Sequence, residues 1–204
     1  MQKTFTPERI ERVIEFHGHN CPGLSIGIRA AELARLRWPD AKDSELVAVV
    51  ETDMCGVDAI QDLLGCTFGK GNLIHRDFGK MAFSFYYRPT GEGFRALLRP
   101  EARGGNAQRM TELMQKMADN CATPEECAEC AAVRMDQQNH FMSEALDTLF
   151  EVAELPLSPP RPARVLESLQ CSSCKEMTME SRTRRYNGQH LCIPCFEKVE
   201  QKMV

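Results

Sequence analysis

Apolar residues recur every three or four positions near the N-terminus, which is the spacing of an amphipathic helix. One helix is predicted over 7–17, with Thr6 as its capping residue and Pro7 in its first turn. A second helix is predicted over 22–37, where Trp38-Pro39-Asp40 ends it. The chain therefore begins with two helices separated by a short turn.

Short β-branched and aromatic runs follow these helices. Residues 45–52 predict a strand, and residues 55–64 predict a helix closed by Gly65. Three further strands are predicted at 73–78, 81–88 and 93–99. Because strands and helices do not alternate regularly, the pattern indicates an α+β domain in which helices pack on an antiparallel sheet.

The second half of the chain predicts helices over 106–118 and 124–152. The first of these has an apolar stripe of Met110, Leu113, Met114 and Met117, which is typical of a core or of a dimer interface. Four prolines then mark a stiff linker over 155–164. We predict a core domain over 1–154, this linker, and a small module over 165–204 that needs a staple in order to fold.

The composition narrows the function classes. A net charge of −4 does not favour nucleic acid as the main partner, although Arg182, Arg184 and Arg185 form either a solvated basic face or a phosphate contact. No apolar run reaches the roughly 18–20 residues of a membrane span, and the polar stretch Met1–Arg12 does not read as a signal peptide. We therefore expect a cytoplasmic protein whose ten cysteines bind metal or react rather than form disulfides.

Four of these cysteines form two Cys-x2-Cys pairs in the C-terminal module. The pairs are Cys171 with Cys174 and Cys192 with Cys195. Two such pairs complete a tetrahedron of thiolates around a structural zinc ion, and redox-active dithiols are the alternative. An Asn187-Gly188 turn and a last helix opening at Cys195 are typical of a treble-clef or zinc-ribbon finger, and the spacing resembles the DksA/TraR type of finger.

A second set of soft ligands lies in the core domain. His17, His19 and Cys21 crowd into five residues, while Cys55 and Cys66 bracket the third predicted helix. Because Cys21 and Cys55 each precede a helix, the helix dipole is expected to make both thiols ionise readily. We predict that these five residues surround one cavity. Near it, Asp77 either orients an imidazole or pairs with Lys80.

This set permits two chemistries. Thiolates with imidazoles suit a second metal ion, most naturally zinc, in a site open to substrate. Alternatively, Cys55 is a catalytic nucleophile with His17 or His19 as its base. The glycine-containing stretch 69–72 is predicted to be a turn, since it lacks the spacing of a phosphate loop. A third cysteine group, Cys121, Cys127 and Cys130 with His140 further on, is predicted to be reduced, helix-packed thiols rather than one arm of a metal site.

Several motifs in the same order resemble FmdE, the E-subunit family of formylmethanofuran dehydrogenase. They are Phe16–Gly23, Cys55–Gln61, Gly65–Leu73 and Asp77–Lys80, within Ile10–Tyr87. The resemblance implies a dimeric α+β core with a metal-associated cavity, joined in some members to a treble-clef zinc finger. It also implies association with molybdenum or tungsten enzyme subunits related to methanogenesis.

The leading hypothesis is therefore a zinc-binding accessory or metal-handling protein of such a system. A metal- or cysteine-dependent enzyme acting on a small carbonyl or formyl substrate is an alternative. A third hypothesis is a module whose finger binds protein or nucleic acid.

Overall fold

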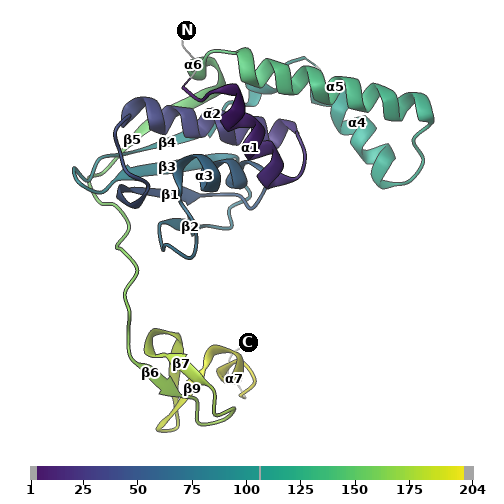
Figure 1. Cartoon of the computed structure of the whole chain (residues 1–204). Helices are drawn as coiled ribbons and strands as arrows, with labels where there is room; N and C mark the ends of the chain where they lie inside the picture. The colour runs from purple at the N-terminus through teal and green to yellow at the C-terminus, as the bar shows by residue number, and fades with distance from the viewer. Residues whose placement is uncertain (1–3, 106, 200–204) are drawn as a thin grey trace. The chain divides into compact units, whose positions relative to one another are not determined.

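The chain, seen here as a computed structural model, is described over residues 4–105 and 107–199 (Figure 1). It divides into two compact units, Met1–Pro162 and Ala163–Val204. Three parts of the sequence predictions lie outside the described residues. They are the start of the polar N-terminal stretch (1–3), Asn106 at the start of a predicted helix, and the end of the finger module (200–204).

The first unit confirms the α+β class. Its helices and strands are, in chain order, α1 (Pro7–His17), α2 (Pro22–Arg37), β1 (Leu46–Val50), α3 (Gly56–Leu64), β2 (Leu73–His75), β3 (Ala82–Tyr87), β4 (Gly93–Leu98), α4 (Ala107–Ala118), α5 (Pro124–Ser143), α6 (Leu146–Leu149) and β5 (Phe150–Leu155). Two short 3-10 helices, Asp43–Glu45 and Pro100–Arg103, connect them. Within the described ranges, no helix has both the length and the apolar character that crossing a bilayer requires.

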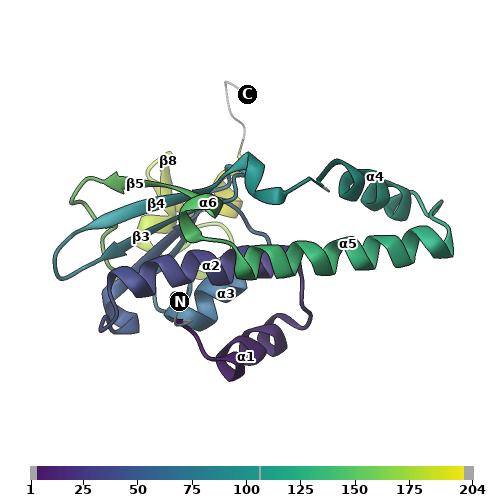
Figure 2. The same cartoon turned by 90° about the horizontal axis from the view of Figure 1, so that it is seen from above.

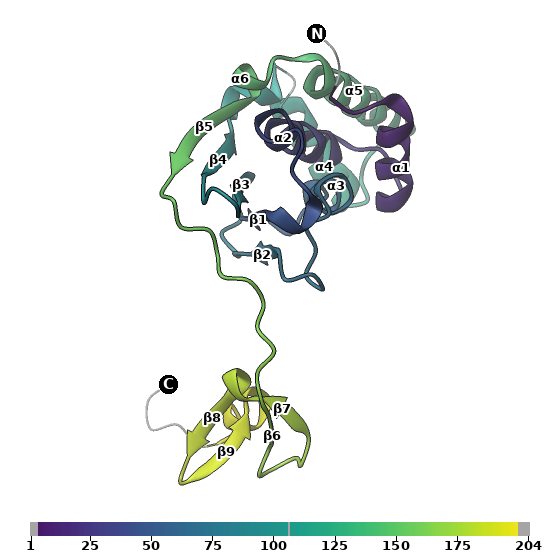
Figure 3. The same cartoon turned by 60° about the vertical axis from the view of Figure 1, so that its left-hand side comes forward.

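The strands form one sheet in the order β2-β1-β3-β4-β5. All neighbouring pairs are antiparallel except β1 and β2, which run parallel with Ala48 opposite Leu73. Helices α2 and α3 lie over one face (Figure 3). Alternate strand residues, such as Ala48, Phe85 and Phe94, point to that face and are buried in the core.

The fifth strand corrects the sequence prediction of a helix continuing to residue 152. The long helix α5 ends at Ser143, and β5 pairs with β4 from Phe150 opposite Leu98 to Leu155 opposite Gly93. Its residues Glu151, Ala153 and Glu154 carry no strand preference. Pairing with an available sheet edge therefore decides the conformation here, against local propensity.

Helices α4 and α5 form a hairpin that projects from the sheet layer (Figure 2). On α4, Leu113 is fully buried, whereas Met114 and Met117 remain 43% and 40% exposed. The predicted packing of the third cysteine group is right for buried Cys130 and wrong for exposed Cys121 and Cys127. Among the described residues, these thiols do not join a group of metal ligands.

The second unit contains two short hairpins and one helical turn. Its elements are β6 (Ser168–Gln170), β7 (Met177–Met179), β8 (Thr183–Tyr186), β9 (Gln189–Cys192) and α7 (Ile193–Phe196). Strand β6 pairs with β7, and β8 pairs with β9. Asn187 and Gly188 both have positive φ, 47° and 77°, in the predicted turn between β8 and β9. The last helix begins at Ile193, two residues before the predicted start at Cys195.

Candidate metal centres

The turn between α1 and α2 carries three of the predicted ligands. Helix α1 ends with His17 because Gly18 adopts a left-handed conformation, with φ 87°, and its N–H donates to the Ile14 and Glu15 carbonyls. His19 follows on the exposed turn. Cys21 then caps α2, and its Sγ accepts a hydrogen bond from the Leu24 N–H at 3.4 Å.

Cys55 reaches this turn because α2 and α3 cross at glycines. A Cβ atom added to Gly27 would lie 2.2 Å from the Gly56 carbonyl oxygen, so no other residue fits there. One turn earlier on α2, a Cβ on Gly23 would lie 3.6 Å from Cys55 Sγ and 4.0 Å from Cys21 Sγ. The close helix crossing therefore places the two thiols beside each other.

The ligand atoms of His17, His19, Cys21 and Cys55 lie within 4.8 Å of one another. We call this group the core cluster. Cys21 Sγ lies 3.7 Å from His17 Nε2, and the His17 and His19 ring centres are 4.4 Å apart. These separations suit ligands about 2.0–2.3 Å from a shared metal ion. Four of the five residues predicted to surround one cavity thus come together.

A carboxylate that sequence reasoning missed holds one of these imidazoles. Asp58 Oδ2 lies 2.7 Å from His17 Nδ1, while Asp58 Oδ1 accepts from Gln61 Nε2 at 3.0 Å. With the Nδ1 proton donated to Asp58, the Nε2 lone pair is directed at the core cluster. This is the role proposed for Asp77, which is exposed and, among the described residues, contacts neither an imidazole nor Lys80.

The expectation of a readily ionised thiol is wrong for Cys55. Burial raises its pKa, and contact with the Cys21 thiol raises it further. Cys55 also makes no capping hydrogen bond through its side chain to α3. A neighbouring thiol and a low-polarity environment therefore outweigh the helix dipole when no cation is present.

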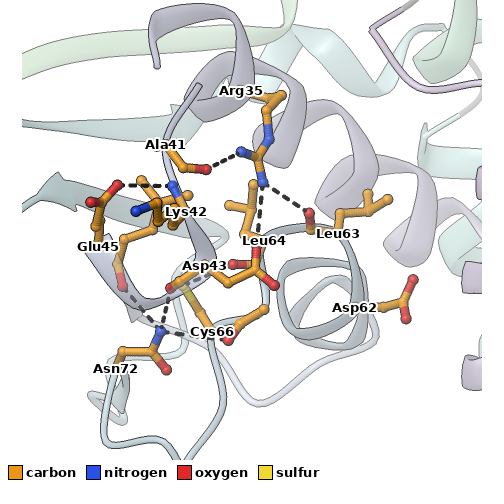
Figure 4. Close-up of polar contacts among 12 residues, drawn as sticks. Arg35, Ala41, Lys42, Asp43, Glu45, Asp62, Leu63, Leu64, Cys66 and Asn72 are labelled. Atoms are coloured by element: carbon orange, nitrogen blue, oxygen red, sulfur yellow. Dashed lines mark hydrogen bonds and ion pairs between the residues drawn. The ribbon is translucent and has the colours of Figure 1, made fainter. Parts of the chain in front are cut away.

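Cys66 is the predicted ligand that the structure does not bring to the core cluster. It is fully buried, and its thiol donates weakly to the Leu64 carbonyl at 3.8 Å (Figure 4). Burial, with a smaller contribution from Asp43, raises its pKa to about 12. Cys66 is therefore a neutral core residue in this structure, and we leave it out of the proposed ligand set.

The loop after Cys66 is a turn, as predicted. Asn72 is buried and closes it by accepting from the Thr67 N–H at 2.9 Å and donating to the Asp43 and Leu46 carbonyls at 3.0 and 3.1 Å (Figure 4). Lys70 Nζ donates to the Gly65 carbonyl at 2.9 Å. The lysine is thus used within the loop.

The four finger cysteines form the second group of ligand atoms within 4.8 Å of one another. Cys174 Sγ and Cys192 Sγ lie 3.8 Å apart, which is the edge of a tetrahedron with zinc–sulfur distances of about 2.3 Å. The Cys192 N–H donates to Cys171 Sγ at 3.3 Å, and this hydrogen bond is the main cause that lowers the Cys171 pKa to about 6. The group therefore fits zinc.

The basic residues of the finger are exposed on or beside β8. Arg184 Nη1 donates to the neighbouring Thr183 carbonyl, and Arg182 contacts only Ser181. These bonds are local, so they are consistent with the solvated basic face that the sequence suggested as one interpretation.

Together, the fold and the two ligand groups define an α+β domain with a histidine–cysteine cluster, joined to a four-cysteine zinc finger. The chain belongs to the FmdE family, described as "FmdE, Molybdenum formylmethanofuran dehydrogenase operon", which matches residues 16–151. The prokaryotic DksA/TraR C4-type zinc finger matches residues 164–201. Both resemblances noted in the sequence are confirmed.

Two individual proteins are similar over most of the chain. The crystal structure of an FmdE-like protein of tungsten formylmethanofuran dehydrogenase from Syntrophus aciditrophicus has a TM-score of 0.61 and 27% identity, covering 93% of this chain and 90% of that one. A probable S-adenosyl-L-methionine-binding protein of Archaeoglobus fulgidus is 29% identical over 191 residues, or 90% of this chain. The chain spans about half, 51%, of the length of that curated relative.

Proposed function

We propose that the core cluster binds one zinc ion in a site that is open on one side, and that the protein handles metal as an accessory of a molybdenum or tungsten formylmethanofuran dehydrogenase-type system. The observation that carries this proposal is the Asp58–His17 pair directed at two thiols. A carboxylate that fixes the tautomer of an imidazole is the usual support of a metal-ligating histidine.

The openness of the site follows from the burial of its ligands. Cys21 is 4% exposed, and the His17 side chain is 10% exposed. His19, in contrast, is exposed on the turn after Gly18. We therefore assign His17, Cys21 and Cys55 as fixed ligands and His19 as the exchangeable one. A ligand that can leave allows a metal ion to be taken up and passed on.

The donor set supports zinc over an oxyanion. Thiolate and imidazole suit zinc, copper(I) or iron, whereas molybdate would need hydrogen-bond donors in place of soft ligands. The association with a formylmethanofuran dehydrogenase system is supported by membership of the FmdE family and by the similarity to the FmdE-like protein of Syntrophus aciditrophicus. We also propose a cytoplasmic location, supported by the free thiols, and a homodimer, supported by the exposed methionines of α4.

The first test is the metal content of the full chain. We expect two zinc ions per chain, measured by inductively coupled plasma mass spectrometry, and one in a variant with Cys21→Ser and Cys55→Ser. A chromophoric chelator should withdraw zinc from the unaltered chain in two phases, of which this variant lacks the faster. A chain that holds a single zinc ion lost only with the finger cysteines would refute the core site.

The second test addresses Asp58. The change Asp58→Asn should weaken core zinc binding about 10- to 100-fold while leaving the finger zinc in place, because the amide cannot stabilise the correct His17 tautomer. Competition with a chelator of known affinity measures this. Asp77→Asn, an equal change at an exposed position, is the control. Equal affinities for the two variants would remove Asp58 from the site.

An enzyme is a second candidate, favoured by the exposure of His19. If substrate takes the His19 position, the zinc ion would polarise a small carbonyl or formyl group. On that interpretation, Cys55 and His17 hold the metal, and His19 is free to act as a base near it.

A further inference from the structure

The sheet face opposite α2 and α3 carries a cavity of about 390 Å³. Its floor is made by outward-facing strand residues, among them Ser84, Tyr86 and Arg95. Its wall is the proline-rich segment after β5, including Ser158 and Arg161. The cavity lies entirely within the first unit, and the residues of the core cluster and the finger do not line it.

The wall is attached to the sheet rather than left loose. Arg88, which follows β3, donates from Nη1 to the Pro160 carbonyl at 2.8 Å. Gly91 lies against Leu157 and Pro159, since a Cβ there would meet each side chain at 3.8 Å. Prolines also limit the conformations of the segment. The cavity is therefore shaped before any ligand arrives.

The cavity has an excess of positive charge. Arg95 is already engaged, because its Nε and Nη2 donate to the two Glu51 oxygens at 2.6 and 2.9 Å. Arg76 and Arg161 also line the cavity, and neither guanidinium forms a hydrogen bond or ion pair among the described residues. Four cationic groups, Arg76, Lys80, Arg95 and Arg161, thus face the carboxylates Glu51 and Glu151.

The remaining lining groups are suited to an organic body. The Tyr86 ring is partly exposed beside the apolar Leu155 and Pro159. Ser84 is 7% exposed on the floor, and Ser158 stands on the opposite wall. The volume lies within the range of about 300–1,000 Å³ that is typical of small-molecule sites.

We propose that this cavity binds a small organic phosphate of about mononucleotide size. The phosphate group would be held by Arg76 and Arg161, because its oxygens can accept from two guanidinium forks at once. The Tyr86 ring would pack against the planar or apolar body of the ligand. Arg95 remains with Glu51 and orders the floor.

The test uses the full chain and isothermal titration calorimetry, with AMP as the probe. AMP is expected to bind more tightly than inorganic phosphate or adenosine, and its affinity should fall with added salt. Each of Arg76→Gln and Arg161→Gln should weaken AMP binding by about tenfold or more. Arg164→Gln removes the same charge three residues beyond Arg161, at a position that does not line the cavity, and should leave the affinity unchanged.

Three results would overturn the proposal. AMP failing to bind the unaltered chain would exclude the ligand class that we name. Equal affinities for AMP and inorganic phosphate would remove the organic body. An Arg164→Gln variant as weak as Arg76→Gln would show attraction by net charge alone. Thermal unfolding of each variant checks that the exposed arginines were replaced without loss of the fold.

Discussion

A variant with Cys171→Ser and Cys174→Ser is expected to unfold the finger while the α+β unit keeps its structure. Among the described residues of the finger, the buried hydrophobic cluster consists of Cys171, Leu191 and Cys192, with Cys195, Phe196 and Val199 packed around it. Half of that cluster consists of zinc ligands. Zinc binding to sites of this type supplies about 10–16 kcal/mol, so its loss leaves too little to order the chain.

Two-dimensional amide NMR spectra measure this outcome. Finger resonances should collapse to the narrow shifts of an unfolded chain, one zinc ion should be lost, and resonances of the first unit should stay in place. A variant with Cys121→Ser and Cys127→Ser is the control, because these thiols are exposed and lie outside both ligand groups. A finger that stays folded without its zinc would show that the four cysteines are not its staple.

The change Gly27→Ala should have the second largest effect, and it acts on the core cluster without touching a ligand. The added methyl would lie 2.2 Å from the Gly56 carbonyl oxygen and 2.5 Å from the Gly56 Cα. Because both atoms are backbone, α2 and α3 must separate. We expect a loss of about 1–3 kcal/mol in unfolding free energy and a strong loss of core zinc, since Cys21 and Cys55 move apart with their helices.

Urea unfolding and zinc analysis measure the two effects separately. Gly69→Ala is the matched control, because a Cβ there meets nothing within 4 Å. A Gly27→Ala variant with full core zinc and unchanged stability would show that the helix crossing does not position the thiols.

Local signals explain how well the sequence predicted the first helices. Thr6 and Pro7 begin α1, Gly18 ends it, and Pro22 begins α2, so their bounds match the predicted ranges 7–17 and 22–37. Each of these signals acts through the backbone of its own or the next residue. The cysteine pairs of the finger were equally readable, because each pair closes on one ion within a few residues.

Long-range packing explains what the sequence did not predict. Strand β5 has no strand propensity of its own and forms because the β4 edge is available. Asp58 lies three residues after Cys55, so both share a helix face, and this spacing was the one available signal for its role. Cys66 lies beyond the left-handed Gly65, which ends α3, and it is buried beside Leu64 and Asp43 instead of returning to the core cluster.

The α1–α2 turn has a consequence for the unfolded chain. His17, His19 and Cys21 belong to this turn, whereas Cys55 lies beyond β1 in the sequence. A metal ion held by all four would be a reversible crosslink that closes the intervening loop. It would restrict the unfolded ensemble as a disulfide does, and it would do so without an oxidising compartment.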